Sequence, residues 1–140
     1  MKIILDTNIL VAACVGSKPA NTIVAQCLQG LYQPIVGTTL LNEYETVLLR
    51  EEIFVNCRLN ATEREELLNI FLASCQWVQI YYAWRPNLID EGDNHLIELA
   101  VAGNARYLIT RNVRDFHNAQ LNFPQLAIRT PENFLQEIFQ

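Results

Sequence analysis

The sequence has no apolar run approaching the roughly 18 residues that a helix needs to cross a bilayer, so we expect no membrane span. Met1 and Lys2 lead straight into a strand-like stretch, which predicts no secretory signal peptide. The four cysteines are scattered and form no C-x-x-C pair, so small buried thiols are expected rather than a zinc site or a disulfide framework. These absences predict a cytoplasmic protein.

Positive charge is also scarce. Ten lysines and arginines face fifteen acidic residues, which gives a net charge of -5. No global basic surface is therefore expected, and this argues against a nucleic-acid-binding module that relies on phosphate contacts alone. An acidic site whose cations contact phosphate remains compatible with this charge.

The chain shows no repeat, low-complexity tract or linker, so residues 1–140 are predicted to form a single domain. A chain of this size can bury roughly two thirds of its unfolded surface. The hydrophobic share of 51% and the charged share of 18% are typical of a compact globular protein.

Short apolar runs alternate with stretches of helical period. The runs predicted to be strands are Lys2–Leu5, Pro34–Val36, Trp77–Ile80 and Tyr107–Ile109, with a weaker fifth at Leu126–Ile128. The stretches predicted to be helices are 7–14, 21–31, 38–50, 92–102, one that begins with a Thr62/Glu65 capping box, and one after an N-cap at Thr130. This alternation predicts a three-layer α/β/α fold around a parallel sheet of four to five strands.

Asp6 follows the first predicted strand at once, with no turn residue between. In open parallel sheets, ligands bind outside the carboxyl ends of the strands. Aspartate at such a boundary also commonly caps the following helix. Position alone does not choose between a ligand site and a cap.

The other aspartates are few: beyond Asp6 the chain has only Asp90, Asp93 and Asp115. Asp93 projects near the apolar stripe of its predicted helix, and an inward carboxylate costs desolvation unless it is paired, hydrogen-bonded or bound to a metal. A role at the helix N-terminus is the alternative. Asp115 follows a strand by a short loop, so it too can lie at the carboxyl edge of the sheet.

A further acid can come from the helix over 38–50. Glu43 and Glu45 lie at opposite borders of its apolar stripe, and periodicity does not choose between them. An all-oxygen set of ligands suits Mg²⁺ or Mn²⁺ rather than zinc. Clustered carboxylates repel one another, and a divalent cation relieves that repulsion. The matching chemistry is metal-assisted hydrolysis of a phosphodiester.

Four stretches in order resemble the PIN domain family, a small α/β ribonuclease fold that includes many toxins of bacterial toxin–antitoxin pairs. These stretches are IILDTNILVAA, LLNEYETVLLR, DEGDNHLIELAVAGNARYLITRNVRDF and IRTPENFL, and together they span nearly the whole chain.

By position, the resemblance implies that Asp6, Glu43 and Asp93 are catalytic, metal-binding acids, with Asp93 preferred to Asp90. The fourth acid is either Asp115 or replaced by Asn112, an amide that carries no charge. The polar positions that would orient the acids or water are Thr7, Asn8, Thr110 and Asn112. If Asp115 does not reach the site, metal affinity should fall.

The resemblance implies an endoribonuclease that depends on Mg²⁺ or Mn²⁺, in which water rather than a side chain attacks phosphorus. It also implies an RNA substrate, an antitoxin partner and a homodimer. Arg111 and Arg114 follow the strand at 107–109 and are candidates for contact with substrate phosphates, the alternative being a solvated face or pairing with Asp115. His95 and His117 have no ligand spacing and are expected on the surface.

Two other functions are compatible with parts of this pattern. A phosphatase with an aspartyl nucleophile at Asp6 usually needs a second acid two residues on, where this chain has Asn8. The stronger alternative is a catalytically impaired PIN-like domain that binds RNA or protein, and Asn112 keeps it open.

Overall fold

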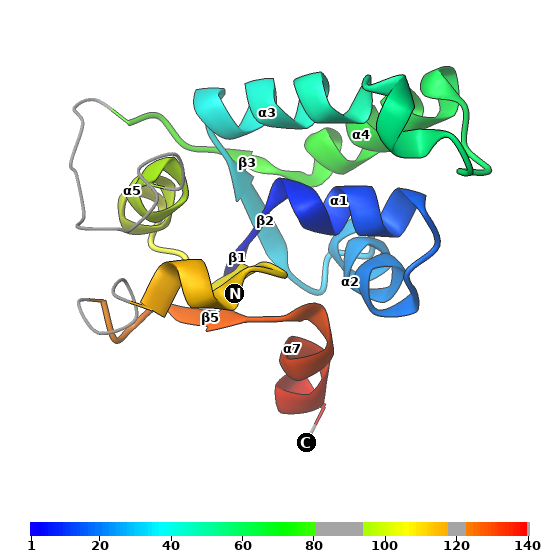
Figure 1. Ribbon diagram of the computed structural model, residues 1–140. Coiled ribbons are helices and arrows are strands. Elements are labelled where there is room, and N and C mark those ends of the chain that lie inside the picture. The colour runs from blue at the N-terminus through cyan, green and yellow to red at the C-terminus, as the bar shows by residue number, and fades with distance from the viewer. Residues whose placement is uncertain (81–93, 118–122, 140) are drawn as a thin grey trace.

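A five-stranded sheet forms the centre of the structure (Figure 1). The computed structural model describes residues 1–80, 94–117 and 123–139. The strands are β1 (Lys2–Leu5), β2 (Gln33–Val36), β3 (Gln76–Trp77), β4 (Tyr107–Ile109) and β5 (Ala127–Arg129). Their order in the sheet is β3-β2-β1-β4-β5, and every neighbouring pair is parallel. This confirms the predicted parallel sheet.

Helices cover both faces of the sheet. They are α1 (Thr7–Cys14), α2 (Lys18–Leu28), α3 (Thr38–Leu48), α4 (Ala61–Ser74), α5 (Asn94–Gly103) and α7 (Pro131–Ile138), with 3₁₀ turns η1 (Glu51–Phe54) and η3 (Val113–Phe116). Figure 1 shows α5 on the opposite side of the sheet from α1 and α2. The three-layer α/β/α arrangement is therefore confirmed. None of the helices within the described ranges is long and apolar enough to cross a membrane.

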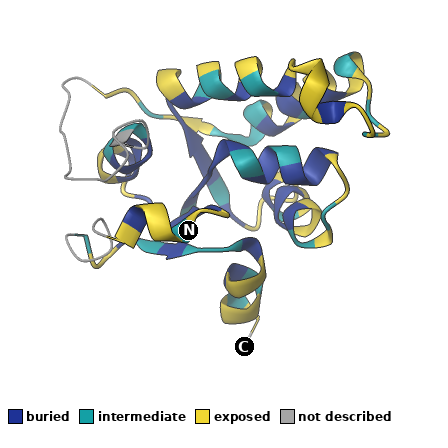
Figure 2. Ribbon diagram, viewed as in Figure 1, coloured by how far each residue is buried: buried dark blue, intermediate teal, exposed yellow. Residues whose placement is uncertain are grey.

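The central strand β1 and its neighbour β4 are buried in the middle of the molecule (Figure 2). The side chains of Ile3, Ile4 and Leu5 in β1 and of Leu108 and Ile109 in β4 are fully buried. Since helices cover both faces, inward and outward side chains alike are buried, which explains why these strands are continuous apolar runs. As the composition predicts, the four cysteines are free thiols that are buried or half-buried.

Two helices begin earlier than predicted. The predicted helix over 21–31 begins at Lys18 instead, after the N-cap Ser17, and ends before Gly30, whose positive φ of 83° turns the chain. The capping box of α4 is formed by Asn60 and Glu63 rather than by Thr62 and Glu65. The sequence holds two overlapping boxes of the same spacing, so spacing alone could not choose between them.

Strand boundaries differ from the prediction at the edges of the sheet. β3 is limited to Gln76–Trp77, whereas the prediction extended to Ile80, and β5 begins one residue later than predicted. At the other end of the chain Thr130 caps α7 and Pro131 lies in its first turn, as predicted. Helix α5 runs to Gly103, where a Cβ would lie 2.5 Å from Ile35 Cδ1 of β2, so glycine permits the close approach of this helix end to the sheet.

A buried arginine holds the connection between α3 and α4. Arg64 is 1% exposed, its Nε donates to Leu48 O at 2.8 Å, and its Nη1 donates to Leu59 O at 2.9 Å. The guanidinium lies over the Phe54 ring at 4.2 Å from its centroid. Its ion pair with Glu51, at 2.9 Å, involves a side chain that is 72% exposed. Water can therefore replace the Glu51 carboxylate as a partner of the guanidinium more easily than it can replace the two backbone carbonyl groups.

We expect Arg64→Met to destabilise the protein by about 2–4 kcal/mol, because two carbonyl oxygens in the α3–α4 connection lose their charged donor. Glu51→Ala should cost less than about 1 kcal/mol, since exposed ion pairs contribute little. Urea denaturation followed by circular dichroism measures both free energies of unfolding. Equal losses in the two variants would show that the ion pair, rather than the carbonyl contacts, stabilises this connection.

Candidate metal site at the carboxyl edge of the sheet

The register of the central strands places Asp6 beside Thr110. Leu5 of β1 is paired with Ile109 of β4, and the residue after each strand is therefore at the same edge of the sheet. The Asp6 backbone N–H donates to Ile109 O at 2.9 Å, which continues the ladder by one step. The polar side chains thus begin where the apolar strands end.

The Asp6 carboxylate is 6% exposed and accepts hydrogen bonds on both oxygens. Its Oδ1 accepts from the Thr7 backbone N–H at 2.7 Å, so Asp6 is indeed the N-cap of α1. Its Oδ2 accepts from the Thr110 hydroxyl at 2.8 Å and from Asn8 Nδ2 at 3.3 Å. Capping uses one oxygen only, so a cap and a second role at Oδ2 are compatible.

Thr110 connects Asp6 with the loop that follows β4. Its hydroxyl donates to Asp6 and accepts from the Asn112 backbone N–H at 3.0 Å. Asn8 Oδ1 in turn accepts from the Arg111 backbone N–H at 3.2 Å. These contacts bring the predicted polar residues Asn8, Thr110 and Asn112 to one place.

Helix α3 brings Glu43 to the same edge. Tyr44 is fully buried and its hydroxyl donates to Leu5 O at 2.5 Å, which sets the rotation of α3 against the end of β1. The neighbouring residue Glu43 consequently faces α1, where its Oε1 accepts from the Thr7 hydroxyl at 2.6 Å. Glu45 is exposed on α3. Of the two glutamates left open by periodicity, the structure thus places Glu43 near Asp6.

Sequence reasoning missed His95. It was expected on the surface, but its side chain is only 13% exposed, and its Nε2 lies 3.1 Å from Glu43 Oε2. Nothing in the spacing of the histidines signals this contact, because it joins α5 to α3 across 52 positions of the chain. His117, by contrast, is exposed as expected.

The two carboxylates experience opposite environments. Burial raises the pKa of Asp6, hydrogen bonds from Thr110 and Thr7 oppose the rise, and the nearby charge of Glu43 adds to it. The hydrogen bond with His95 and that from Thr7 hold the pKa of Glu43 below its ordinary value. The charged form of Asp6 is therefore less favourable than that of a solvated aspartate, and a nearby cation would stabilise it.

The arginines and Asp115 are exposed in the chain that follows β4. Arg111 is exposed, and its Nη2 contacts Ser17 Oγ at 3.3 Å. Arg114 and Asp115 are exposed in η3. The Asn112 backbone N–H donates to the Thr110 hydroxyl, and the Asn112 side chain is exposed.

Asp93 and Asp90 lie outside the described residues. Among the residues that the structure does describe, no group of three or more His, Cys, Asp or Glu side chains could hold a metal. What the described part offers is two carboxylates, Asp6 and Glu43, that both contact Thr7 and are surrounded by hydroxyl and amide groups. Their oxygens are the donor type that a hard divalent cation such as Mg²⁺ or Mn²⁺ prefers, although His95 Nε2 also contacts Glu43.

We expect Asp6→Asn to gain stability relative to the wild type as the pH rises from the acidic range towards neutral, in the presence of a chelator. A raised pKa means that the folded protein binds the Asp6 proton more tightly than the unfolded chain, so wild-type stability is lost as the pH rises through the folded pKa. Urea denaturation over this pH range measures the difference in free energy of unfolding between Asp6→Asn and the wild type, with Glu45→Gln as the control. A difference that stays constant with pH would contradict the argument.

Comparison with known proteins identifies the family and the fold. The sequence matches the PIN domain family over residues 2–114. Among solved structures, the chain is similar to the crystal structure of VapBC2 from Rickettsia felis bound to a DNA fragment from their promoter. The TM-score is 0.58 at 16% sequence identity, over 93% of this chain and 98% of that one. No curated protein matches the sequence.

The family match covers more than half of the chain and includes β1, α3, α5 and β4, the elements that carry the polar cluster. At 16% identity, the structural similarity supports the same fold independently of the family match. The chain belongs to the PIN domain family.

Proposed function

We propose that this protein is an endoribonuclease that hydrolyses RNA phosphodiester bonds with Mg²⁺ or Mn²⁺, and that it is the toxin of a toxin–antitoxin pair. The main observation in support of the proposal is that Asp6 and Glu43 both accept hydrogen bonds from Thr7 at the carboxyl edge of the sheet. Membership of the PIN domain family, whose members are typically nucleases, supports it.

In this proposal Asp6, Glu43 and Asp93 hold the metal. The cation, when bound, would activate water and stabilise the charge that develops on phosphate oxygens. Thr110 and Thr7 hold the carboxylates in place by donating to Asp6 Oδ2 and Glu43 Oε1. His95 fixes the second oxygen of Glu43, and residues of this kind typically change metal affinity when they are mutated.

Substrate binding would use cations outside the acidic cluster. The Arg111 backbone N–H donates to Asn8, which is two residues from Asp6. The Arg111 side chain therefore extends from a backbone position at the edge of the site. Arg111 and Arg114 are both exposed and are proposed to contact RNA phosphates. A net charge of -5 is compatible with RNA binding if phosphates meet the protein at these arginines and at the metal.

The proposed partners are an antitoxin protein and a second copy of the chain. The similarity to VapBC2 of Rickettsia felis, whose crystal structure contains promoter DNA, supports an antitoxin partner. A cytoplasmic location is proposed from the four free thiols, two of which are buried. Burial raises the pKa of Cys14 to about 11 and that of Cys27 to about 12, so both stay protonated and unreactive.

One observation favours the alternative of an impaired RNA- or protein-binding module. Asn112, rather than an acid, is the residue whose backbone N–H donates to Thr110, and an amide side chain gives a metal no charge. If Asp115 does not reach the site, the negative charge of a fourth acid is missing. The experiments that follow distinguish the two functions.

We expect Mn²⁺ to raise the melting temperature of the wild type and to have little effect on Asp6→Asn. A ligand that binds only the folded protein contributes about 2.7 kcal/mol at a concentration one hundred times its dissociation constant. Thermal denaturation with Mn²⁺ and with a chelator measures the shift. Glu45→Gln, at an exposed position of α3, should respond like the wild type. An equal shift in Asp6→Asn would place the metal elsewhere.

The fourth ligand position can be tested with the same titration. The Asn112 backbone N–H donates to the Thr110 hydroxyl, which itself donates to Asp6, so we expect Asn112→Asp to strengthen Mn²⁺ binding by adding a carboxylate to this loop. If Asp115 completes the site instead, Asp115→Asn will weaken binding, and Asn112→Asp will not strengthen it.

We expect the wild type to cleave RNA with Mn²⁺ and Asp6→Asn to be inactive. Thr7→Val should lose about 10- to 100-fold in activity, because Glu43 loses the hydroxyl that orients it. Thr7→Ser keeps that hydroxyl and should stay near the wild type. Gel analysis of end-labelled RNA measures the rates. If the wild type leaves RNA intact but binds it, the binding-module function replaces the nuclease.

A further inference from the structure

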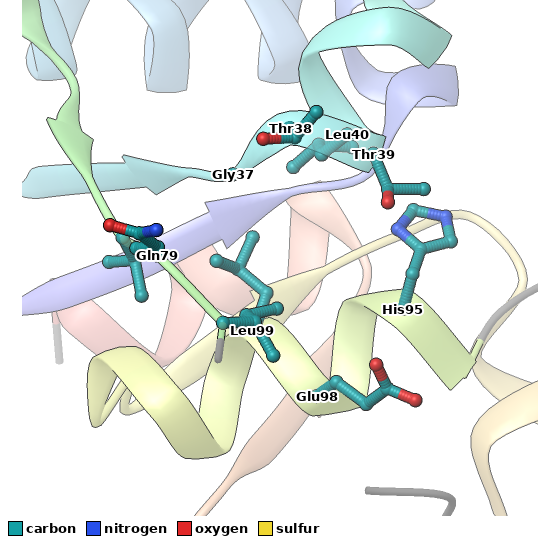
Figure 3. A pocket seen from close by; sticks show the side chains of 10 residues that line it. Gly37, Thr38, Thr39, Leu40, Gln79, His95, Glu98 and Leu99 are labelled. Atoms are coloured by element: carbon teal, nitrogen blue, oxygen red, sulfur yellow. The ribbon is translucent and has the colours of Figure 1, made fainter. Parts of the chain in front are cut away.

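A pocket lies beside the acidic cluster, between the first turn of α3, the chain after β3 and α5 (Figure 3). Its volume is about 360 Å³, within the range of about 300–1,000 Å³ that is typical of small-molecule sites. Figure 3 shows His95 and Leu99 projecting from α5, and Thr39 close to the His95 ring. The pocket is therefore large enough for a small organic group.

His95 connects the pocket to the acidic cluster. Its imidazole lines the pocket, and its Nε2 lies 3.1 Å from Glu43 Oε2. Glu43 contacts the Thr7 hydroxyl, and the Thr7 backbone N–H contacts Asp6. A phosphate at the carboxylates would thus be separated from the pocket by a single side chain.

The chemistry of the lining selects a neutral group rather than an anion. None of the described residues that line the pocket is a lysine or an arginine, and one of them is Glu98. Thr39 and Gln79 offer groups that both donate and accept hydrogen bonds. Leu99 and Val78 supply an apolar wall. A phosphate would be repelled here, whereas an aromatic base with polar edges matches both the apolar and the polar parts.

We propose that this pocket binds the nucleoside next to the scissile phosphate, with preference for a base that carries an exocyclic amino group. The amino group is the donor that the Glu98 carboxylate can accept. The location of this nucleoside next to the scissile phosphate rests on the proposed nuclease function. Binding of a nucleoside does not, because it requires neither metal nor cleavage.

The test is a nuclear magnetic resonance titration of the wild-type protein with adenosine, cytidine or uridine in the presence of a chelator. Uncharged nucleosides avoid contributions from phosphate. The amide signals of Gly37, Gln79 and Leu99 should shift with adenosine and cytidine, and less with uridine. Shifts confined to residues outside the pocket, or no shift with any nucleoside, would overturn the proposal.

Two tryptophan variants on α3 provide a matched pair. Thr39 and Thr46 are both exposed on this helix, but only Thr39 lines the pocket. Thr39→Trp should fill the pocket and abolish the shifts, whereas Thr46→Trp should keep them. Glu98→Gln should reduce the difference between the amide shifts caused by adenosine and those caused by uridine. Nucleoside-induced shifts that persist in Thr39→Trp would overturn the assignment of the pocket. If adenosine and uridine shifts differ as much in Glu98→Gln as in the wild type, the proposed role of the carboxylate would be wrong.

A separate RNA cleavage assay keeps the two proposals distinguishable. Nucleoside binding without cleavage would support the pocket and contradict the nuclease. Cleavage without nucleoside binding, with the same cut positions in the wild type and in Thr39→Trp, would support the nuclease and overturn the pocket.

Discussion

The pairing of β1 with β4, in the register that joins Leu5 to Ile109, is the constraint on which the polar cluster depends. A shift of one residue would reverse the faces of the strand and separate Asp6 from Thr110. The buried side chains on both faces of β1 oppose such a shift. The Tyr44 hydroxyl then ties α3 to Leu5 O, so a single strand end positions residues from three elements.

The cluster illustrates how a protein holds unfavourable charge in place. Asp6 is buried beside a second carboxylate, and its charged form is disfavoured by burial. Hydroxyl and backbone donors offset part of this cost and keep the oxygens oriented. In the proposed function, a bound cation would stabilise the charged form of Asp6. Under that proposal, stability without the cation and metal binding make opposite demands on Asp6.

In the proposed function, this acidic protein acts on RNA, so its attraction for RNA phosphates must be limited to a small part of its surface. The net charge of -5 lowers non-specific binding to the backbone of nucleic acids. In the proposed function, phosphate recognition is limited to the metal and to the exposed arginines that follow β4. The pocket beside His95 would then add contacts to a base rather than to phosphate, which is where sequence preference arises.

The sequence by itself determined the layers of the fold, because continuous apolar runs alternating with helical periods are stable only as a parallel sheet covered on both faces. It also determined α1 and the start of α7, since Asp6 and Thr130-Pro131 are local signals that tertiary contacts need not modify. Local signals failed where two alternatives satisfied the same rule. The capping boxes at Asn60 and Thr62 have equal spacing, and the glutamates at 43 and 45 border the same stripe.

Only the tertiary structure decided between these alternatives, through contacts between distant residues. The rotation of α3 follows from Tyr44 meeting Leu5, which turns Glu43 rather than Glu45 towards Thr7. The position of His95 follows from the packing of α5 against β1 and α3, and no local pattern encodes it. Periodicity describes which face of a helix is buried, whereas the partner on that face is set by the path of the whole chain.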